Sequence, residues 1–466
     1  LFTMTLLNNL IEEGLLVRSS DGYWLPPAAS IPVPTILRQL IDQRVKRLGV
    51  NAEKLLSVAA VVGETWPLEI IEPLLDLSEE DLLAALQKAL ATDMIVVEDD
   101  RDETYRFSHG LTKQVLYSKQ LARLRKKLHQ QIAAQFEKQQ RSNFYAMAHH
   151  FYEAEEWAKA YKYSIAAGEL ASQSFANNRA LDLYKKGLDA AQRGATEIKA
   201  EQLLDAYERL GNAYRVLDRL QEAEIIFSRM RDAAQSMDNQ EAEVRALAHL
   251  THIRISLYQM DVAEQTAQEA LKISEQIDDP RLLVRIHDSL VKLLIVRGHL
   301  DGLTPHFNEI LHHARELDDP ASLSAAFRQK AYKEIFTGRY AEAEALAQQS
   351  LDLGKKANLP LQIAGGYQIL SYSQIEAGKY REAFRHLRFI LDFNEISDSY
   401  HHQLPRLLNQ MGYLYLELGD AETALCWDGR AVESSRSSPG TSNFEMQRYS
   451  LLNLATDYLY LGKIEA

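Results

Sequence analysis

Apolar residues along most of the chain recur with the three-to-four-residue spacing of amphipathic helices, and a glycine interrupts them at a regular interval. The glycines lie 40 to 43 residues apart, each between two helix-like segments: Gly298, Gly338, Gly378, Gly419 and Gly462. A period of this size predicts stacked pairs of antiparallel helices, which bury a continuous core by adding one unit to the next. Most of the chain is therefore expected to form an extended binding surface.

The positions around each turn support this repeat. Small or medium-sized residues let two helix backbones approach closely. In the first helices they recur at Gly211, Thr251, Val291, Ala331, Ser371, Gly412 and Ala455, and near the start of the second helices at Ala223, Ala263, Leu303, Ala343, Ala383 and Ala424. The turn glycine suits a left-handed backbone conformation. Asp218 and Tyr258 take its place in the two earliest units.

This pattern resembles the tetratricopeptide repeat family in its long variant of about 40 residues, over roughly residues 141–466. The resemblance implies an all-α tetratricopeptide-repeat α-solenoid, a right-handed superhelix, and says little about the ligand. Residues 143–192 fit the period less well, and we expect one long and one shorter helix there as an N-terminal adaptor. The chain begins without Met and ends in mid-repeat, so we expect a fragment with a truncated last repeat.

The N-terminal third has a different pattern. Residues 1–14 have helical spacing, and Asp21-Gly22 lies between two apolar runs, which is a hairpin signal. Helices are expected at 35–48, 51–62, 67–76 and 79–91, strands at 94–97 and 104–107, and two more helices within 109–140. Helices followed by a hairpin describe a small winged-helix module with a short β-hairpin. We divide the chain into 1–30 (tail of an upstream helical or ATPase region), 31–117 (winged helix), 118–140 (linker helix) and 141–466 (repeats).

The segment from Ile31 onward resembles the region that follows the nucleotide-binding core in signal-transduction ATPases with numerous domains (STAND), many of which are bacterial transcription activators of the maltose-regulon type. The matching pieces are Leu48–Gly63, the Phe107-Ser108-His109 step and the run Leu128–Ala133, followed by repeats. The resemblance implies a switch in which ADP locks the ATPase core against the winged helix. Inducer binding on the repeats, with ATP exchange, then opens the protein and lets it oligomerise.

The same resemblance assigns a role to His109. It matches the winged-helix histidine that contacts the β-phosphate of the nucleotide in related ATPases, which makes it a candidate ADP sensor. The related motif is Met-His-Asp, whereas this chain has Ser108-His109-Gly110. The alternative is a histidine that caps or packs locally at a helix start.

Charge and motifs limit the chemistry. The net charge of −13 argues against broad nucleic-acid affinity, and we expect the basic run Lys119–His129 to be a solvated or packed helix face. No GxxxxGK[ST] motif occurs, so this chain is not expected to be an enzyme or to hold a cofactor, whereas the full-length protein could bind ATP or ADP.

The single cysteine, Cys426, is expected to pack inside a helix, and its isolation fits a cytoplasmic protein with no membrane contact. Adjacent histidine pairs point in different directions on a helix, so no metal site is expected.

The best candidate site is the concave wall formed by the first helices. Four positions of each first helix are expected to face it: those six and three before, one after and four after the close-packing residue. The candidates at these positions are Arg245, His252, Arg285, Lys292, Arg328, Tyr332, Gln368, Tyr372, Arg406, Asn409 and Tyr413. Arginine and tyrosine are common recognition groups for peptides, carboxylates and sugars. The alternative is that these side chains make contacts between repeats or face water.

Together these patterns predict the sensor portion of a bacterial signal-transduction ATPase, whose repeats bind an inducer, a peptide or a protein partner and relay this to the upstream nucleotide-binding domain. The alternative is a stand-alone repeat adaptor that scaffolds protein complexes without nucleotide. A third interpretation is a DNA-binding regulator that uses its own winged helix. The expected helix at 79–91 has an acidic start and a single lysine, which disfavours DNA contact.

Overall fold

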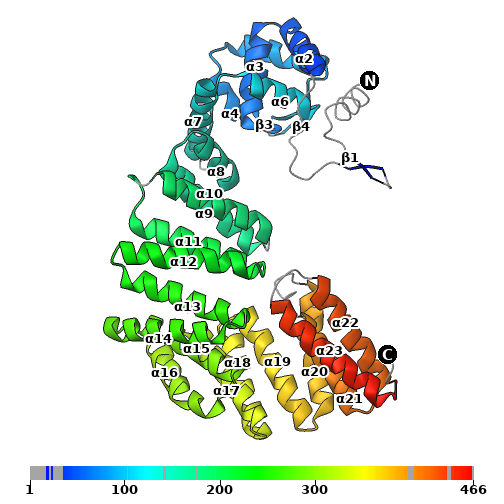
Figure 1. Ribbon diagram of the computed structural model, residues 1–466. Coiled ribbons are helices and arrows are strands. Elements are labelled where there is room, and N and C mark those ends of the chain that lie inside the picture. Colours follow the sequence, from blue (N-terminus) through cyan, green and yellow to red (C-terminus); the bar gives the residue numbers. More distant parts are fainter. Residues whose placement is uncertain are drawn as a thin grey trace. The chain divides into compact units, whose positions relative to one another are not determined.

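The chain folds into a mainly helical protein, for which we describe a computed structural model (Figure 1). The described residues are 17–19, 22–24, 35–101, 103–139, 143–174, 176–194, 196–396, 404–437 and 442–463. Contacts group the chain into two compact units. Unit 1 comprises residues 1–167 and 189–197, and unit 2 comprises residues 168–188 and 198–466. Within the described residues, no helix is long and apolar enough to cross a lipid bilayer.

Unit 1 is built around one apolar helix, α3 (Val50–Val62), whose Leu55 and Leu56 are fully buried. Helices α5, α6 and α7 pack against it because it is apolar on nearly all sides. The helices of this unit are α2 (Thr35–Arg47), α3, α4 (Leu68–Ile71), the 3-10 turn η1 (Glu72–Leu74), α5 (Glu79–Ala91), α6 (Gly110–Lys119), α7 (Ala122–Lys138), α8 (Phe144–Glu153) and most of α9 (Trp157–Gln173).

A small antiparallel sheet completes unit 1, with the strand order β3 (Thr65–Pro67), β5 (Thr104–Phe107), β4 (Ile95–Asp99). The hairpin of β4 and β5 directly after α5 confirms the expected order of helices and strands. Strand β3 was not expected, and the predicted helix at 67–76 is wrong in extent. Pro67 ends the strand, the helix runs only over α4 and η1, and Trp66 is fully buried against Tyr105, with ring centroids 5.1 Å apart.

The chain start is described only in part. The predicted hairpin at Asp21-Gly22 is confirmed by the antiparallel pair β1 (Val17–Ser19) and β2 (Gly22–Trp24). The helix expected over 1–14 lies outside the described residues.

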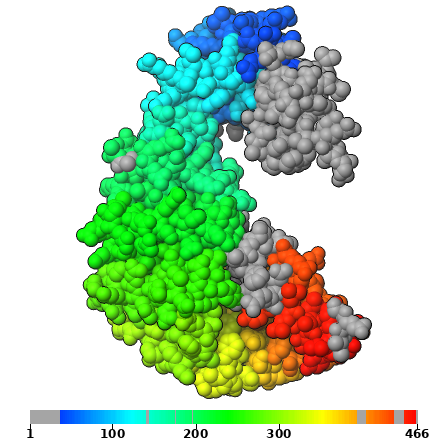
Figure 2. All heavy atoms as spheres, viewed as in Figure 1, coloured from blue at the N-terminus to red at the C-terminus, as the bar shows by residue number. Residues whose placement is uncertain are grey.

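Unit 2 is an array of helix pairs, and its atoms form a continuous stack from the green to the yellow part of Figure 2. The first helices of the pairs are α11 (Ala200–Val216), α13 (Gln240–Ser256), α15 (Pro280–Val296), α17 (Pro320–Phe336), α19 (Pro360–Glu376), α21 (Leu404–Glu417) and α23 (Ser442–Tyr460). The second helices are α12 (Leu220–Ser236), α14 (Met260–Ile277), α16 (Leu303–Glu316, preceded by η2, Leu300–Gly302), α18 (Tyr340–Lys356), α20 (Tyr380–Ile396) and α22 (Ala421–Ser437). This is the predicted tetratricopeptide-repeat solenoid.

The turns within helix pairs and the turns between successive pairs both contain a residue with a left-handed backbone conformation. The five turn glycines have φ between 68° and 80°, and Asp218 and Tyr258 take the same conformation with φ of 56° and 59°. A second set, not expected from the glycines, ends the second helices: Asp238, Asp278, Asp318 and Asn358. Asp and Asn tolerate this conformation better than other non-glycine residues, so the array needs no glycine at these turns.

The close-packing positions are buried as expected. All six residues near the starts of the second helices, such as Ala223 and Ala343, have no exposed surface. Ala455 alone of the first-helix set is exposed, and no described second helix covers it. Apolar clusters follow one another along the array instead of forming one core, which is the usual organisation of a repeat protein.

The helices that precede the regular array correct one expectation. Residues 143–192 form three helices and not one long and one shorter helix: α8, α9 and α10 (Asn177–Arg193). Turns at Glu155 and near Ala176 separate them. The Trp157 and Asn178 segments start two successive helices, which is why their spacing of about 20 residues did not fit the longer period.

A buried carboxyl pair joins α22 to α23 and predicts an unusual pH dependence. Asp428 and Asp457 are fully buried, and Asp428 packs against Gly412. Burial raises the pKa of both carboxyl groups, that of Asp428 to about 8 with a further contribution from Asp457, and that of Asp457 to about 6. A raised pKa means that the pair stabilises the fold fully below its unfolded pKa near 3.8, and that this contribution is lost as the pH rises through 6 to 8.

We therefore expect the amides of α22 and α23 to lose protection between pH 6 and pH 8. Hydrogen exchange corrected for its intrinsic pH dependence measures this loss. In Asp428→Asn, which cannot ionise, the protection is expected to change much less over the same range. An equal pH trend in the two proteins would show that the pair does not control this interface.

Candidate functional site

Successive first helices pack on one another along the array, α13 on α15, α15 on α17, α17 on α19, and α19 on α21. Polar and aromatic side chains of these helices contact each other from one repeat to the next. We call the surface formed by these side chains on α11, α13, α15, α17, α19 and α21 the first-helix face. All eleven residues predicted for the concave wall lie on these helices.

The first part of the first-helix face is an ionic cluster around Glu208 on α11. Its carboxylate contacts Arg245 Nε at 3.1 Å, His249 Nε2 at 3.1 Å and Arg285 Nη1 at 3.3 Å, and so connects α11, α13 and α15. Burial raises the pKa of Glu208, but His249 and the two arginines outweigh it and lower that pKa to about 2. Burial also lowers the pKa of His249, so at neutral pH the positive charge comes from the arginines.

The second part centres on Asp288 of α15. Its carboxylate accepts hydrogen bonds from Lys292 Nζ at 2.7 Å and from Gln329 Nε2 at 2.7 Å, and lies 3.5 Å from His252 Nε2. Burial is the main cause that lowers the pKa of His252, and the nearby charge of Lys292 lowers it further. A quarter of the His252 side chain (26%) is nevertheless accessible to water. His252 is thus largely surrounded by protein and partly accessible to water.

The third part is a row of three tyrosines. Tyr332, Tyr372 and Tyr413 occupy the same position in α17, α19 and α21, and successive rings meet edge to face with centroids 6.3 and 6.4 Å apart. Each is half-buried. Tyr413 donates a hydrogen bond to Glu376 Oε1 at 2.9 Å. Burial raises the pKa of Tyr372 to about 12, so all its recognition chemistry at neutral pH is that of a neutral phenol.

Buried amides border this tyrosine row. Gln329, Gln368, Asn409 and Gln410 are at most 9% exposed. In each, one side-chain amide atom has no hydrogen-bond partner among the described residues: Gln329 Oε1, Gln368 Nε2, Asn409 Oδ1 and Gln410 Oε1. A buried polar atom without a partner costs about 1–3 kcal/mol. These atoms are themselves buried, so water or a ligand could pair with them only after neighbouring side chains move aside.

The remaining predicted wall residues lie beside this row. Arg328 donates a hydrogen bond to Gln362 Oε1 at 3.0 Å, and its side chain lies against Gly365, which has no Cβ to obstruct it. Asn409 donates to Ser450 Oγ at 3.0 Å, and Arg406 is half-buried on α21. The structure thus gives the arginines near the start of the array internal partners and leaves the tyrosine–amide part as the stronger candidate for recognition.

Four side chains of the first-helix face were not among the predicted residues: Glu208, Asp288, Gln329 and Gln410. Glu208 and Asp288 stand at the position three before the close-packing residue, where Arg328, Gln368 and Asn409 were selected. Their repeat position therefore placed them on the predicted face, but the prediction named only basic, aromatic and amide residues there. The Glu208 carboxylate pairs with Arg245 and Arg285, and the Asp288 carboxylate pairs with Lys292. These three basic side chains therefore have partners within the protein.

The predicted features of unit 1 have different environments. His109 is exposed at the start of α6, and its side chain does not cap the helix. In the basic run, Lys119 pairs with Glu53 at 3.0 Å and Arg125 donates to the Gln120 carbonyl oxygen at 2.9 Å, so much of its charge is used within the unit. The expectation for Cys426 is wrong, because this side chain is exposed on α22.

Comparisons with known proteins place this geometry in context. No family model and no curated protein matches the sequence. Among solved structures, a STAND protein with a tetratricopeptide repeat sensor from Pyrococcus horikoshii matches 93% of this chain at 14% identity and a TM-score of 0.52. This chain spans 65% of that protein.

Two regulators are also similar. A Rap conjugation gene regulator of the plasmid pLS20, solved with a peptide, matches 73% of this chain and 90% of its own at 16% identity and a TM-score of 0.50. The quorum sensor NprR from B. thuringiensis matches 74% of this chain and 90% of its own at 14% identity and a TM-score of 0.47. At these identities the first two likenesses support the fold alone. The chain is a protein of tetratricopeptide-type helical repeats.

Proposed function

We propose that this chain is the sensor portion of a signal-transduction ATPase with numerous domains, whose repeats bind a peptide or protein partner on the first-helix face. Unit 1 acts as a winged-helix relay to an upstream nucleotide-binding core, and His109 senses its ADP. The chain itself is not an enzyme, and ATP or ADP belongs to the full-length protein. The likeness of fold over 93% of the chain to such an ATPase supports this proposal.

The tyrosine row with its buried amides is the observation that carries the binding role. A peptide main chain alternates donors and acceptors, and side-chain amides offer both kinds of group. Each tyrosine has a polar residue four positions earlier on the same helix face, namely Arg328, Gln368 or Asn409. An extended peptide along this row would gain apolar contact from the rings, and main-chain hydrogen bonds from the amides once the side chains that cover them move aside. The pLS20 regulator of similar fold is itself solved with a peptide.

A peptide selected on this protein from a displayed library of random dodecapeptides tests the binding role. We expect Tyr372→Ala to weaken its binding by about tenfold or more, because the ring lies at the centre of the row. Fluorescence anisotropy with the labelled peptide measures the affinity. Phe384→Ala is the matched control, since it removes a partly exposed ring from the second helix α20 and is expected to leave binding unchanged.

Failure to select any peptide, or equal weakening by both variants, would contradict binding on the first-helix face. Thermal melting of each variant followed by circular dichroism separates lost binding from lost folding. A peptide that binds equally well to the wild type and Tyr372→Ala would place recognition elsewhere on the molecule.

The alternative is a stand-alone repeat adaptor that scaffolds protein complexes without nucleotide. The native polypeptide discriminates between the two functions. A P-loop upstream of Leu1 would support the ATPase switch, whereas a native chain without one would leave an adaptor that binds partners through the same face.

A further inference from the structure

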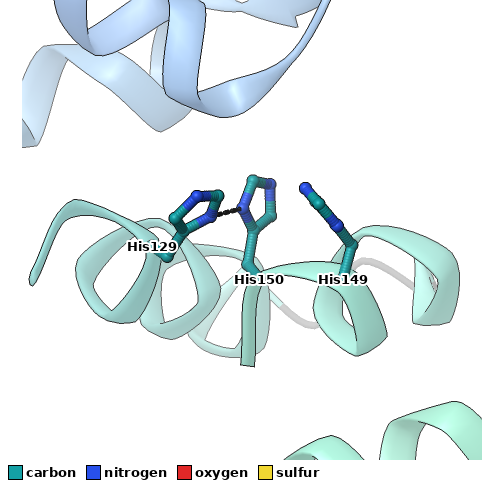
Figure 3. A group of neighbouring side chains, drawn as sticks. All are labelled: His129, His149 and His150. Carbon is teal, nitrogen blue, oxygen red and sulfur yellow. Dashed lines mark hydrogen bonds between the residues drawn. The ribbon is translucent and has the colours of Figure 1, made fainter. Parts of the chain in front are cut away.

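Three histidines of unit 1 come together where α7 packs against α8 (Figure 3). His129 lies on α7, and His149 and His150 lie on α8. One ligand nitrogen of each lies within 4.8 Å of the other two. His129 and His150 are each 1% exposed, whereas His149 is exposed. The third histidine lies on a different helix from the adjacent pair, so spacing within one helix does not reveal that the three meet.

The two buried rings approach each other through their Nδ1 atoms. His129 Nδ1 lies 2.8 Å from His150 Nδ1. Their opposite edges are held by other groups, since Tyr117 Oη lies 3.1 Å from His129 Nε2 and His150 bonds to the backbone of Val62. Histidines that bind a metal through one nitrogen commonly donate the other N–H to a carbonyl or a similar oxygen, which fixes the ring. Tyr117 and Val62 are placed to do this for His129 and His150.

Two nitrogen lone pairs facing each other at this distance need a positive centre between them. A proton on one Nδ1 meets the need, and so does a cation bound by both. Both rings are buried, and burial favours the uncharged imidazole that metal ligation requires. His149 lies beside both, with its ring centroid 5.5 Å from that of His129 and 5.1 Å from that of His150, and offers a third nitrogen.

We propose that His129, His149 and His150 form a three-histidine site for Zn²⁺ or a chemically similar divalent transition metal. Imidazole is a preferred ligand of Zn²⁺, Co²⁺, Ni²⁺ and Cu²⁺, and three histidines with a fourth position open to water is a known zinc arrangement. Bound metal would clamp α7 to α8. The Zn–N distance of about 2.0–2.1 Å requires the two facing rings to separate slightly from their hydrogen-bonded position.

The exposed ligand gives the cleanest test, because His149→Gln leaves the buried pair in place and is expected to fold. Co²⁺ is titrated into the metal-stripped protein, and the visible absorption of tetrahedral cobalt and the melting temperature are followed. We expect one equivalent to bind and to raise the melting temperature of the wild type. His149→Gln removes one of the three proposed ligands and is expected to bind at least about 10–100-fold more weakly, which is the loss that substitution of a ligand's hydrogen-bond partner alone causes.

His312→Gln provides the matched control, since His312, His313 and Glu316 form the second cluster of potential ligands among the described residues, on the unrelated helix α16. This variant should retain the cobalt spectrum and the full rise in melting temperature. Absence of a tetrahedral spectrum in the wild type, or equal affinity in the wild type and His149→Gln, would overturn the proposal. Loss of the spectrum in His312→Gln alone would overturn it as well.

Discussion

Replacing Glu208 by Gln is expected to lower the free energy of unfolding of the α11–α15 region by about 3 kcal/mol at neutral pH. Glu208 is the one carboxylate in contact with both Arg245 and Arg285 across three repeats in the described structure. Its pKa falls from 4.5 to about 2, and each pKa unit corresponds to about 1.4 kcal/mol. Gln keeps the shape of the side chain but leaves two half-buried arginines without their counter-charge. Leaving a partly desolvated charge without its partner lowers the stability of the fold.

The pH dependence has a defined sign. A lowered folded-state pKa stabilises the fold above the unfolded value of about 4.5, and the contribution is lost as the pH falls toward about 2. Wild-type protein should therefore lose stability over this acid range, whereas Glu208→Gln should lose much less. Urea unfolding, with hydrogen exchange to localise it to α11, α13 and α15, measures both effects.

Glu222→Gln is the matched control, because Glu222 forms an exposed pair with Arg219 three residues earlier. Pairs of this kind contribute less than about 1 kcal/mol. Equal losses in the two variants would show that Glu208 acts as a surface charge and that the repeats are not coupled through it.

The repeat fold was readable from the sequence because one periodic signal repeats many times. A glycine in each turn and a small residue at each close approach recur every 40 residues or so, and both have a local physical cause. The turns that end the second helices also recur at regular positions, namely Asp238, Asp278, Asp318 and Asn358. It was missed because Asp and Asn are common on any polar surface, whereas glycine stands out.

The candidate site was only partly readable. Periodicity places Tyr332, Tyr372 and Tyr413 on one face, and the structure brings their rings into contact. Periodicity does not show which charges meet across repeats. The contact of Glu208 with Arg285 spans 77 residues, and His129 and His150 meet across two helices. Such contacts depend on tertiary packing, which a one-dimensional pattern does not determine.

Replacing Gly366 by Ala is expected to destabilise the α18–α19 pair by about 2 kcal/mol. A Cβ at this position would lie 2.9 Å from Leu351 Cα and 3.1 Å from Leu351 N. These are backbone atoms, so no side-chain rotation relieves the overlap and α19 must move away from α18. Overpacking of this kind costs about 1–3 kcal/mol or more, of which the better helix propensity of Ala recovers about 1 kcal/mol.

Gly429→Ala on α22 separates packing from propensity, since a Cβ there would meet nothing within 4 Å. It should stabilise its helix by up to about 1 kcal/mol, so the two substitutions are expected to differ in sign and by about 3 kcal/mol in urea unfolding. Because α19 also carries Gln368 and Tyr372, its displacement in Gly366→Ala should weaken binding of the selected peptide, while Gly429→Ala should not. Stabilisation by both substitutions would mean that a Cβ at position 366 fits between α18 and α19 without displacing either helix. The close approach of these two helices would then not fix the position of the tyrosine row.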